Sequence, residues 1–216
     1  MNDTIIKTLL SELDRVIKAA GTLAVANSIA EQPESLIAPI ENVNKSLEKA
    51  TITSRDVLER LWRETEKSQA GAIAKPLMNI AGTVRTMEYD WLHIRLNTLL
   101  PHCRFQAPIY LSDTITRLLD MFTAVGGKIP YHRNAMLIID EHCDIQNRNV
   151  YDQDNKGWKA VSNALKGRVF PDDDQFSLGV ALVSTLTESI SCNIFVIGAR
   201  DAGEFFNLRS SGALYW

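Results

Sequence analysis

The residues with the clearest chemical potential lie between positions 152 and 175. The segment Asp152–Asn155 reads Asp-Gln-Asp-Asn, Lys159 follows it, and the segment Asp172–Gln175 reads Asp-Asp-Asp-Gln. Carboxylates brought together in this way commonly hold a hard divalent cation such as Mg²⁺. A lysine beside them stabilises the negative charge that builds on a phosphoryl group in its transition state. The residue types and their spacing therefore favour a metal-dependent phosphodiester hydrolase.

A short helix over residues 155–166 is expected to position these groups. Trp158, Val161 and Leu165 recur at helical spacing and form its predicted core face. A neighbouring stripe is basic and polar, and Gly167 then turns the chain back toward the second acidic segment. The residues predicted to contact nucleic acid along this stripe and just after it are Lys156, Lys159, Lys166 and Arg168.

A purely structural reading of the same residues stands beside the functional one. An Asp-x-Asp-Asn segment before a helix is commonly an N-cap, because its carboxylates accept hydrogen bonds from exposed amides. A run of aspartates is commonly a turn, and a lysine stripe is usually a solvated helix face. The spacing alone leaves both readings open.

Composition limits the classes of partner. The chain has 216 residues, 45% of them hydrophobic and 23% charged, with a formal net charge of −3. Proteins that coat nucleic acid neutralise phosphates with clustered Lys and Arg, so any such contact here must come from a local stripe. The same balance leaves a protein partner open.

The sequence also bears on location. It has no run of eighteen apolar residues, which predicts no membrane contact, and its first residues are unlike a secretory signal. Cys103, Cys143 and Cys192 are widely spaced, which indicates free thiols rather than a zinc site. These features predict a cytoplasmic protein.

The apolar patterning predicts an α+β protein in three parts. Residues 1–100 are expected to be helical: a first helix, a second over 40–49, a third begun by the capping-box pattern Thr53-x-x-Asp56, and a fourth from Pro76 to Pro101. This region is a candidate hairpin or bundle with a partner or dimer surface. Residues 101–200 are expected to form a mixed sheet with two helices on one face. Residues 201–216 form an apolar tail without a predicted position.

Within residues 101–200 the expected order is strand, helix, strand, helix, strand, strand. The strands are predicted at 104–110, 133–145, 178–186 and 193–197. The first helix begins at the cap Ser112 and ends at Gly126-Gly127. The second is the helix over 155–166.

This segment resembles the RusA-type Holliday junction resolvases, a phage-associated endonuclease family. The family signature reads Asp-x-Asp-Asn, Lys-Ala, Asp-Ala-Leu, Gly and Asp-Asp-x-Gln. The matching positions here, over a resemblance that covers about residues 101–200, are Asp152, Asp154, Asn155, Lys159, Ala160, Ala164, Leu165, Gly167, Asp172, Asp173 and Gln175.

The resemblance implies specific roles. Asp152, Asp154 and Asp173 would bind Mg²⁺, or Mn²⁺ in its place, and Lys159 would complete the catalytic set. The family acts on four-way junctions as a homodimer. One extra residue stands before Lys159, which makes Lys156 a second candidate for the lysine role, and Asn163 stands where the family usually has Asp.

Two functional hypotheses follow. The first is a RusA-like Mg²⁺-dependent endonuclease of a phage or mobile element that cleaves structured DNA or RNA. The second is a RusA-fold binding protein that inhibits a host nucleic-acid-targeting defence complex, in the manner of an anti-CRISPR protein, through protein–protein contacts. An acidic protein can occupy a basic nucleic-acid channel by charge complementarity.

Overall fold

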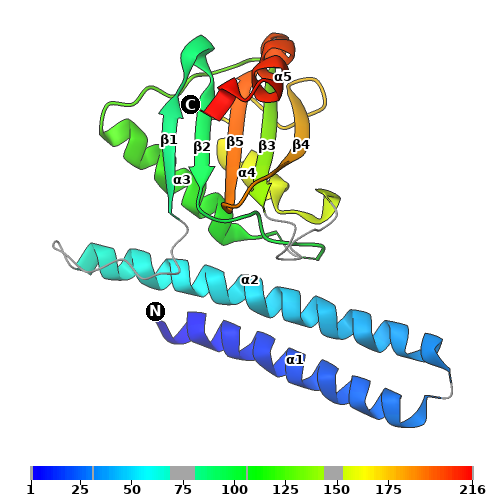
Figure 1. Cartoon of the computed structure of the whole chain (residues 1–216). Helices are drawn as coiled ribbons and strands as arrows, with labels where there is room; N and C mark the ends of the chain where they lie inside the picture. The colour runs from blue at the N-terminus through cyan, green and yellow to red at the C-terminus, as the bar shows by residue number, and fades with distance from the viewer. Residues whose placement is uncertain (1, 31, 69–80, 106, 144–152, 216) are drawn as a thin grey trace. The chain divides into compact units, whose positions relative to one another are not determined.

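The computed structural model describes residues 2–30, 32–68, 81–105, 107–143 and 153–215 (Figure 1). The chain divides into two compact units. The helical unit comprises Met1–Asn79 with Cys103–Tyr110, and the sheet unit comprises Ile80–His102 with Leu111–Trp216. No helix among the described residues is both long enough and apolar enough to cross a membrane.

The helical unit is built on two long helices, α1 (Asn2–Ile29) and α2 (Ile37–Ser68), which pair as an antiparallel hairpin (Figure 1). The prediction of separate helices at 40–49 and from Thr53 was wrong, because α2 is continuous and Thr53 is buried within it. Pro39 is tolerated because it falls in the first turn of α2, where amides lack helical partners.

The predicted strand over 104–110 was also wrong. Its amides bond to side chains of α2 rather than to another strand. Glu48 accepts hydrogen bonds from the amides of Arg104 at 2.9 Å and Phe105 at 2.6 Å, and Asp56 accepts from the amide of Tyr110 at 2.6 Å. Arg55 donates to the Tyr110 hydroxyl at 2.8 Å.

The sheet unit contains a five-stranded mixed sheet in the order β1-β2-β5-β3-β4. The strands are β1 (Gly82–Thr86), β2 (Leu92–Leu96), β3 (Ala135–Cys143), β4 (Leu178–Leu186) and β5 (Ser191–Gly198). β3 and β4 are parallel and joined through α4 (Trp158–Leu165), whereas the other pairs are antiparallel. The predicted α+β class and mixed sheet are confirmed.

The hairpin β1–β2 replaces the helix predicted from Pro76 to Pro101, and it extends the sheet unit back to Ile80 rather than to residue 101. Leu92, Ile94 and Leu96 alternate with polar residues, the period of a strand. Gly82 permits a close approach here, since a Cβ at this position would lie 2.7 Å from the Arg95 carbonyl oxygen.

The two faces of the sheet differ in chemistry. One face is apolar and includes Ile94, Ile139 and Ile194, and helices α3 (Ile109–Ala124) and α4 cover it (Figure 1). The opposite face combines an aromatic cluster with charged residues. Its apolar part is closed by α5 (Ala202–Ser210), whose Phe205 packs on Phe195 with ring centroids 5.0 Å apart. The tail thus packs on its own sheet.

Candidate functional site

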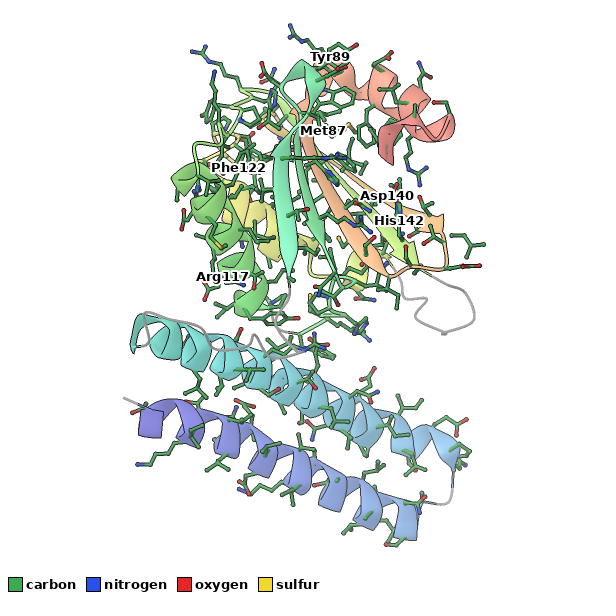
Figure 2. All side chains as sticks on the ribbon, turned by 60° about the vertical axis from the view of Figure 1, so that its left-hand side comes forward. Met87, Tyr89, Arg117, Phe122, Asp140 and His142 are labelled. Atoms are coloured by element: carbon green, nitrogen blue, oxygen red, sulfur yellow. The ribbon has the colours of Figure 1, made fainter. Side chains whose placement is uncertain are left out.

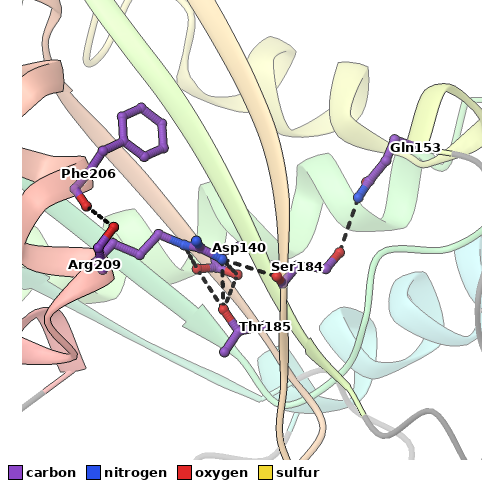
Figure 3. A network of polar contacts seen from close by, with 7 residues as sticks. Asp140, Gln153, Ser184, Thr185, Phe206 and Arg209 are labelled. Carbon is purple, nitrogen blue, oxygen red and sulfur yellow. Dashed lines mark hydrogen bonds and ion pairs between the residues drawn. The ribbon is translucent and has the colours of Figure 1, made fainter.

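The opening of the acidic motif follows the carboxyl-terminal end of β3. Asp152 lies outside the described residues, and of Asp154 the structure describes the backbone, within the 3₁₀ turn η4 (Gln153–Asn155). Gln153 Nε2 donates to Ser184 Oγ at 3.1 Å (Figure 3). Ser184 is paired in register with Glu141 near the ends of β4 and β3. The turn therefore lies at the carboxyl-terminal edge of the two parallel strands.

Lys156 is held by a buried carboxylate. Its ammonium forms an ion pair with Glu141, whose side chain is 2% exposed. The other Glu141 oxygen accepts a hydrogen bond from the amide of Leu100 at 2.7 Å. Because the ammonium already has this partner, Lys156 is bound within the protein rather than presented to a ligand.

Lys159 differs from Lys156 in being exposed, in the first turn of α4. Its Nζ lies 5.8 Å from the centroid of the neighbouring Trp158 ring. Val161 and Leu165 are fully buried, as their spacing predicts, and Asn163 is exposed on the solvent side. The predicted core face is thus confirmed for Val161 and Leu165, whereas Trp158 is half-buried. The helix begins at Trp158 rather than at residue 155, so Lys156 precedes it and is not part of its exposed stripe.

The second acidic segment is an exposed turn whose carboxylates pair with the nearby Lys166. Lys166 Nζ lies 2.5 Å from Asp172 Oδ1 and 2.9 Å from Asp173 Oδ1. The hydrogen bond from Lys166 is the main cause that lowers the pKa of Asp173, and these carboxylates raise the pKa of Lys166 above its ordinary value. The next residue, Asp174, caps the turn by accepting from the amides of Phe176 at 2.7 Å and of Ser177 at 3.0 Å.

Arg168, the remaining cation predicted to contact nucleic acid, pairs with Asp120 at 2.8 Å. Lys166 and Arg168 therefore both have carboxylate partners in this structure. A phosphate would have to replace those partners before either residue could contact it.

In the described part of the chain, η4 and the acidic turn lie at opposite ends of β4. Gln153 bonds to Ser184 near one end of β4, whereas Asp174 lies just before the other end, at Leu178. Ser184 lies six positions after Leu178 on the extended strand, about 20 Å at roughly 3.3 Å per residue. Within the described part of the chain, no three His, Cys, Asp or Glu side chains form a group suited to a metal ion.

A buried ion pair lies near the carboxyl-terminal ends of β3 and β4. The sequence did not indicate this pair. Asp140 is fully buried, and Arg209 Nε from α5 approaches its Oδ2 at 2.6 Å (Figure 3). Thr185 Oγ1 donates to Asp140 Oδ1 at 2.9 Å. The available sequence signal was the pair of acidic residues, Asp140 and Glu141, inside an otherwise apolar strand. Nothing local pointed to Arg209, which is 69 positions away.

A buried histidine, His93, lies on the face of the sheet that carries the aromatic cluster and the charged residues, called here the polar face. His93 Nε2 lies 3.0 Å from Asn193 Oδ1, Arg85 Nε donates to His93 Nδ1 at 2.9 Å, and the ring stacks on Phe195. Burial lowers the pKa of His93 to about 4 despite the hydrogen bond to Asn193, so the imidazole is neutral near pH 7. A neutral ring suits this geometry, with one nitrogen donating and the other accepting.

Comparison with known proteins identifies a family. The family model described as "Family of unknown function (DUF6100)" matches residues 2–212, which spans both units. No curated protein matches the chain.

Proposed function

The chain belongs to the DUF6100 family, and we propose that it is a Mg²⁺-dependent endonuclease of the RusA-like type that acts on structured nucleic acid. The observation that carries the proposal is the position of η4 in the connection between β3 and α4, beyond the carboxyl end of a strand with a parallel neighbour. Ligands of open α/β sheets bind outside the carboxyl ends of such strands.

The donor set of this connection suits a hard cation. Asp152 and Asp154 would supply carboxylate oxygens, and Mg²⁺ requires only one or two of these, because water and phosphate complete its octahedron. When bound, the ion would polarise the phosphate and lower the pKa of an attacking water. Mn²⁺ would be accepted by the same oxygen ligands.

Of the two candidate lysines, Lys159 has the better environment for the catalytic role. Its ammonium is exposed beside Trp158, whereas that of Lys156 is paired with buried Glu141. An exposed ammonium in the first turn of α4 is able to approach a phosphoryl oxygen as negative charge accumulates there. We therefore assign transition-state stabilisation to Lys159 and positioning of the turn to Lys156.

Asp173 requires a different explanation, because it precedes the Leu178 end of β4, and that end lies about 20 Å along the strand from the Ser184 that Gln153 contacts. We infer that the Asp173 that completes one metal site belongs to a second copy of the chain in a homodimer. Each of the two sites would then contain Asp152 and Asp154 from one copy and Asp173 from the other. Paired sites of this kind suit symmetric cleavage of two strands.

The helical unit provides a surface for such a dimer. Ile6, Leu10, Leu13 and Ile17 are 39–69% exposed and recur at intervals of four, three and four residues along α1. This is the spacing of a coiled-coil seam, in which apolar residues repeat every 3.5 positions on average. Pairing of two copies would remove these side chains from water.

The direct test is cleavage of branched DNA and of structured RNA, each with Mg²⁺ and with EDTA. Wild-type protein is expected to cleave at least one substrate only with Mg²⁺, and Asp154→Asn is expected to lose at least a hundredfold in rate, because it removes a charged ligand. Asp14→Asn, an exposed acid of α1, is the matched control and should retain activity. Cleavage that survives Asp154→Asn would refute this assignment of the site.

The separation of the acidic segments also favours a second candidate function. If no copy of the chain assembles a metal site, the exposed turn Asp172–Asp174 is an anionic surface suited to the basic nucleic-acid channel of a host defence complex. Inhibition of such a complex that persists in the double variant Asp152→Ala with Asp154→Ala would support binding. Loss of inhibition in that variant, with folding retained, would support chemistry instead.

A further inference from the structure

The tip of the β1–β2 hairpin has an unusual backbone. Glu88 to Trp91 form the turn, and its two central residues, Tyr89 and Asp90, have φ angles of 62° and 57°. Such two-residue hairpin turns normally contain Asn-Gly or similar pairs, since positive φ disfavours residues with a Cβ. A bulky aromatic residue in this conformation is a true outlier, and strain of this kind concentrates at binding sites.

Burial does not compensate for this strain. The Tyr89 side chain is 65% exposed at the hairpin tip, where Figure 2 labels it, and its ring lies 5.5 Å from that of Trp91. A second tyrosine, Tyr131, is 54% exposed on the segment that precedes β3. Both residues line one hollow of about 640 Å³. That volume is within the usual range of ligand sites, about 300–1,000 Å³.

Three segments form this hollow and are bonded to one another. Thr86 Oγ1 donates to the carbonyl of Lys128 at 2.7 Å, and His132 Nε2 lies 3.0 Å from the carbonyl of Asp90. Trp91 Nε1 donates to Asp201 at 3.2 Å. The hairpin tip is thereby fixed to the segment before β3 and to the turn after β5.

Cations outnumber carboxylates around the hollow. Lys128, Arg133 and Arg200 are exposed along its wall, opposed by Asp90 and Asp201. Among the described residues, Lys128 and Arg133 take part in no ion pair, and the Arg200 side chain is 92% exposed and 3.4 Å from Asp201. The hollow therefore carries one more cation than carboxylate, in a protein whose formal net charge is −3. The nearby turn at Asp172 and Asp173 is neutralised in part by Lys166.

We propose that this surface, the Tyr89 hollow (Tyr89, Lys128, Tyr131, Arg133 and Arg200), binds a single-stranded segment of nucleic acid. Exposed aromatic rings stack on unpaired bases, whose faces a duplex hides, while Lys and Arg contact the phosphates. The hollow would thus hold an unpaired strand of the structured substrate. This inference deepens the proposed endonuclease function, yet it concerns binding alone and requires no metal.

The test is the anisotropy of fluorescein-labelled oligo(dT) and oligo(U) titrated with the full chain in EDTA, with a labelled duplex alongside. Wild-type protein is expected to bind a single strand more tightly than the duplex, and the two oligomers distinguish DNA from RNA. Tyr89→Phe, which keeps the ring, is expected to bind like wild type. Tyr131→Ala is expected to weaken binding about tenfold.

Tyr89→Gly gives the most discriminating result, because glycine adopts the positive φ without strain. This variant is expected to unfold at a higher temperature than wild type and yet to bind at least tenfold more weakly. Lys128→Gln with Arg133→Gln should lower the affinity and flatten its dependence on salt. Lys18→Gln, which removes one cation from α1, is the control and should change neither.

Unchanged affinity in both Tyr89→Gly and the double cation variant would overturn the inference, as would absence of single-strand binding by wild type. Binding by wild type without any cleavage would contradict the proposed endonuclease function and leave this inference supported. Mg²⁺-dependent cleavage by wild type, together with unchanged single-strand affinity in Tyr89→Gly and in the double cation variant, would overturn this inference alone.

Discussion

The charged residues at the two ends of the parallel strands β3 and β4 differ in burial and in the origin of their partners. At the carboxyl-terminal edge of β3 and β4, Asp140 and Glu141 are buried and pair with Arg209 and Lys156 from distant parts of the chain. At the amino-terminal edge, the carboxylates of the acidic turn are exposed and pair with Lys166, six positions before Asp172. Pairs of the first kind depend on the fold, and pairs of the second kind depend mainly on local sequence.

Breaking the buried pair should have the largest effect. Arg209→Met leaves the carboxylate of Asp140 buried without its cation, which is expected to cost about 3–5 kcal/mol of unfolding free energy. Urea denaturation followed by circular dichroism measures this. Arg168→Met, which removes the exposed cation beside Asp120, should cost less than about 1 kcal/mol. Equal losses in the two variants would contradict the distinction between buried and exposed ion pairs.

Lowering the pH should reduce the stability of the protein through His93, the buried histidine of the polar face. In the unfolded chain His93 takes a proton near pH 6.5, whereas in the folded protein its pKa is about 4. The unfolded state therefore binds more protons between these values, and stability should fall as pH decreases from about 6.5 to 4. The loss attributable to this group is of the order of 3 kcal/mol.

Comparison with a variant isolates this contribution. His93→Gln keeps a polar side chain without the titrating ring, so its urea midpoint should change less over that pH window than the wild-type midpoint. His132→Gln, which removes a partly exposed histidine, serves as the control. An identical pH dependence in wild type and His93→Gln would show that His93 does not control acid stability.

The smallest effect on stability is expected at the amino-terminal end of β4, where the ion pair between Lys166 and Asp173 is exposed. Lys166→Met removes the main cause that lowers the pKa of Asp173, so this pKa should rise toward its ordinary value. Carboxyl chemical shifts followed by NMR during an acid titration report the change. The unfolding temperature should be almost unaffected, because the pair is exposed to solvent. A large loss of stability would show that the turn depends on this cation.

Much of the sheet unit could be predicted because its signals are local. β3 begins with the apolar run Ala135–Ile139, and α3 ends at Ala124, just before Gly126, which has a φ of 88°. The sequence did not predict the hairpin β1–β2, and the reason is physical. Its turn contains Tyr89 and Asp90 rather than Asn-Gly, and the apolar residues around it also fit a helical period.

The candidate site was predictable only in part. The residue types and the helix that follows Asp154 could be inferred from spacing, but their separation from Asp173 depends on the length of β4 and on its parallel pairing with β3. The pairing of Asp140 with Arg209 is likewise a product of tertiary structure, since α5 brings Arg209 back to the sheet 69 positions after Asp140. Spacing along the chain carries no information on such distances.

The most direct test of the central claim mixes two inactive variants in one dimer. Asp154→Asn and Asp173→Asn are co-expressed with different tags, and cleavage of branched DNA with Mg²⁺ is compared with that of each variant alone. If each metal site combines the two copies, mixed dimers regain one site. Random pairing then predicts about a quarter of the wild-type activity, since half of the dimers are mixed. Activity in either variant alone, or none in mixed dimers that bind as wild type does, would contradict the account.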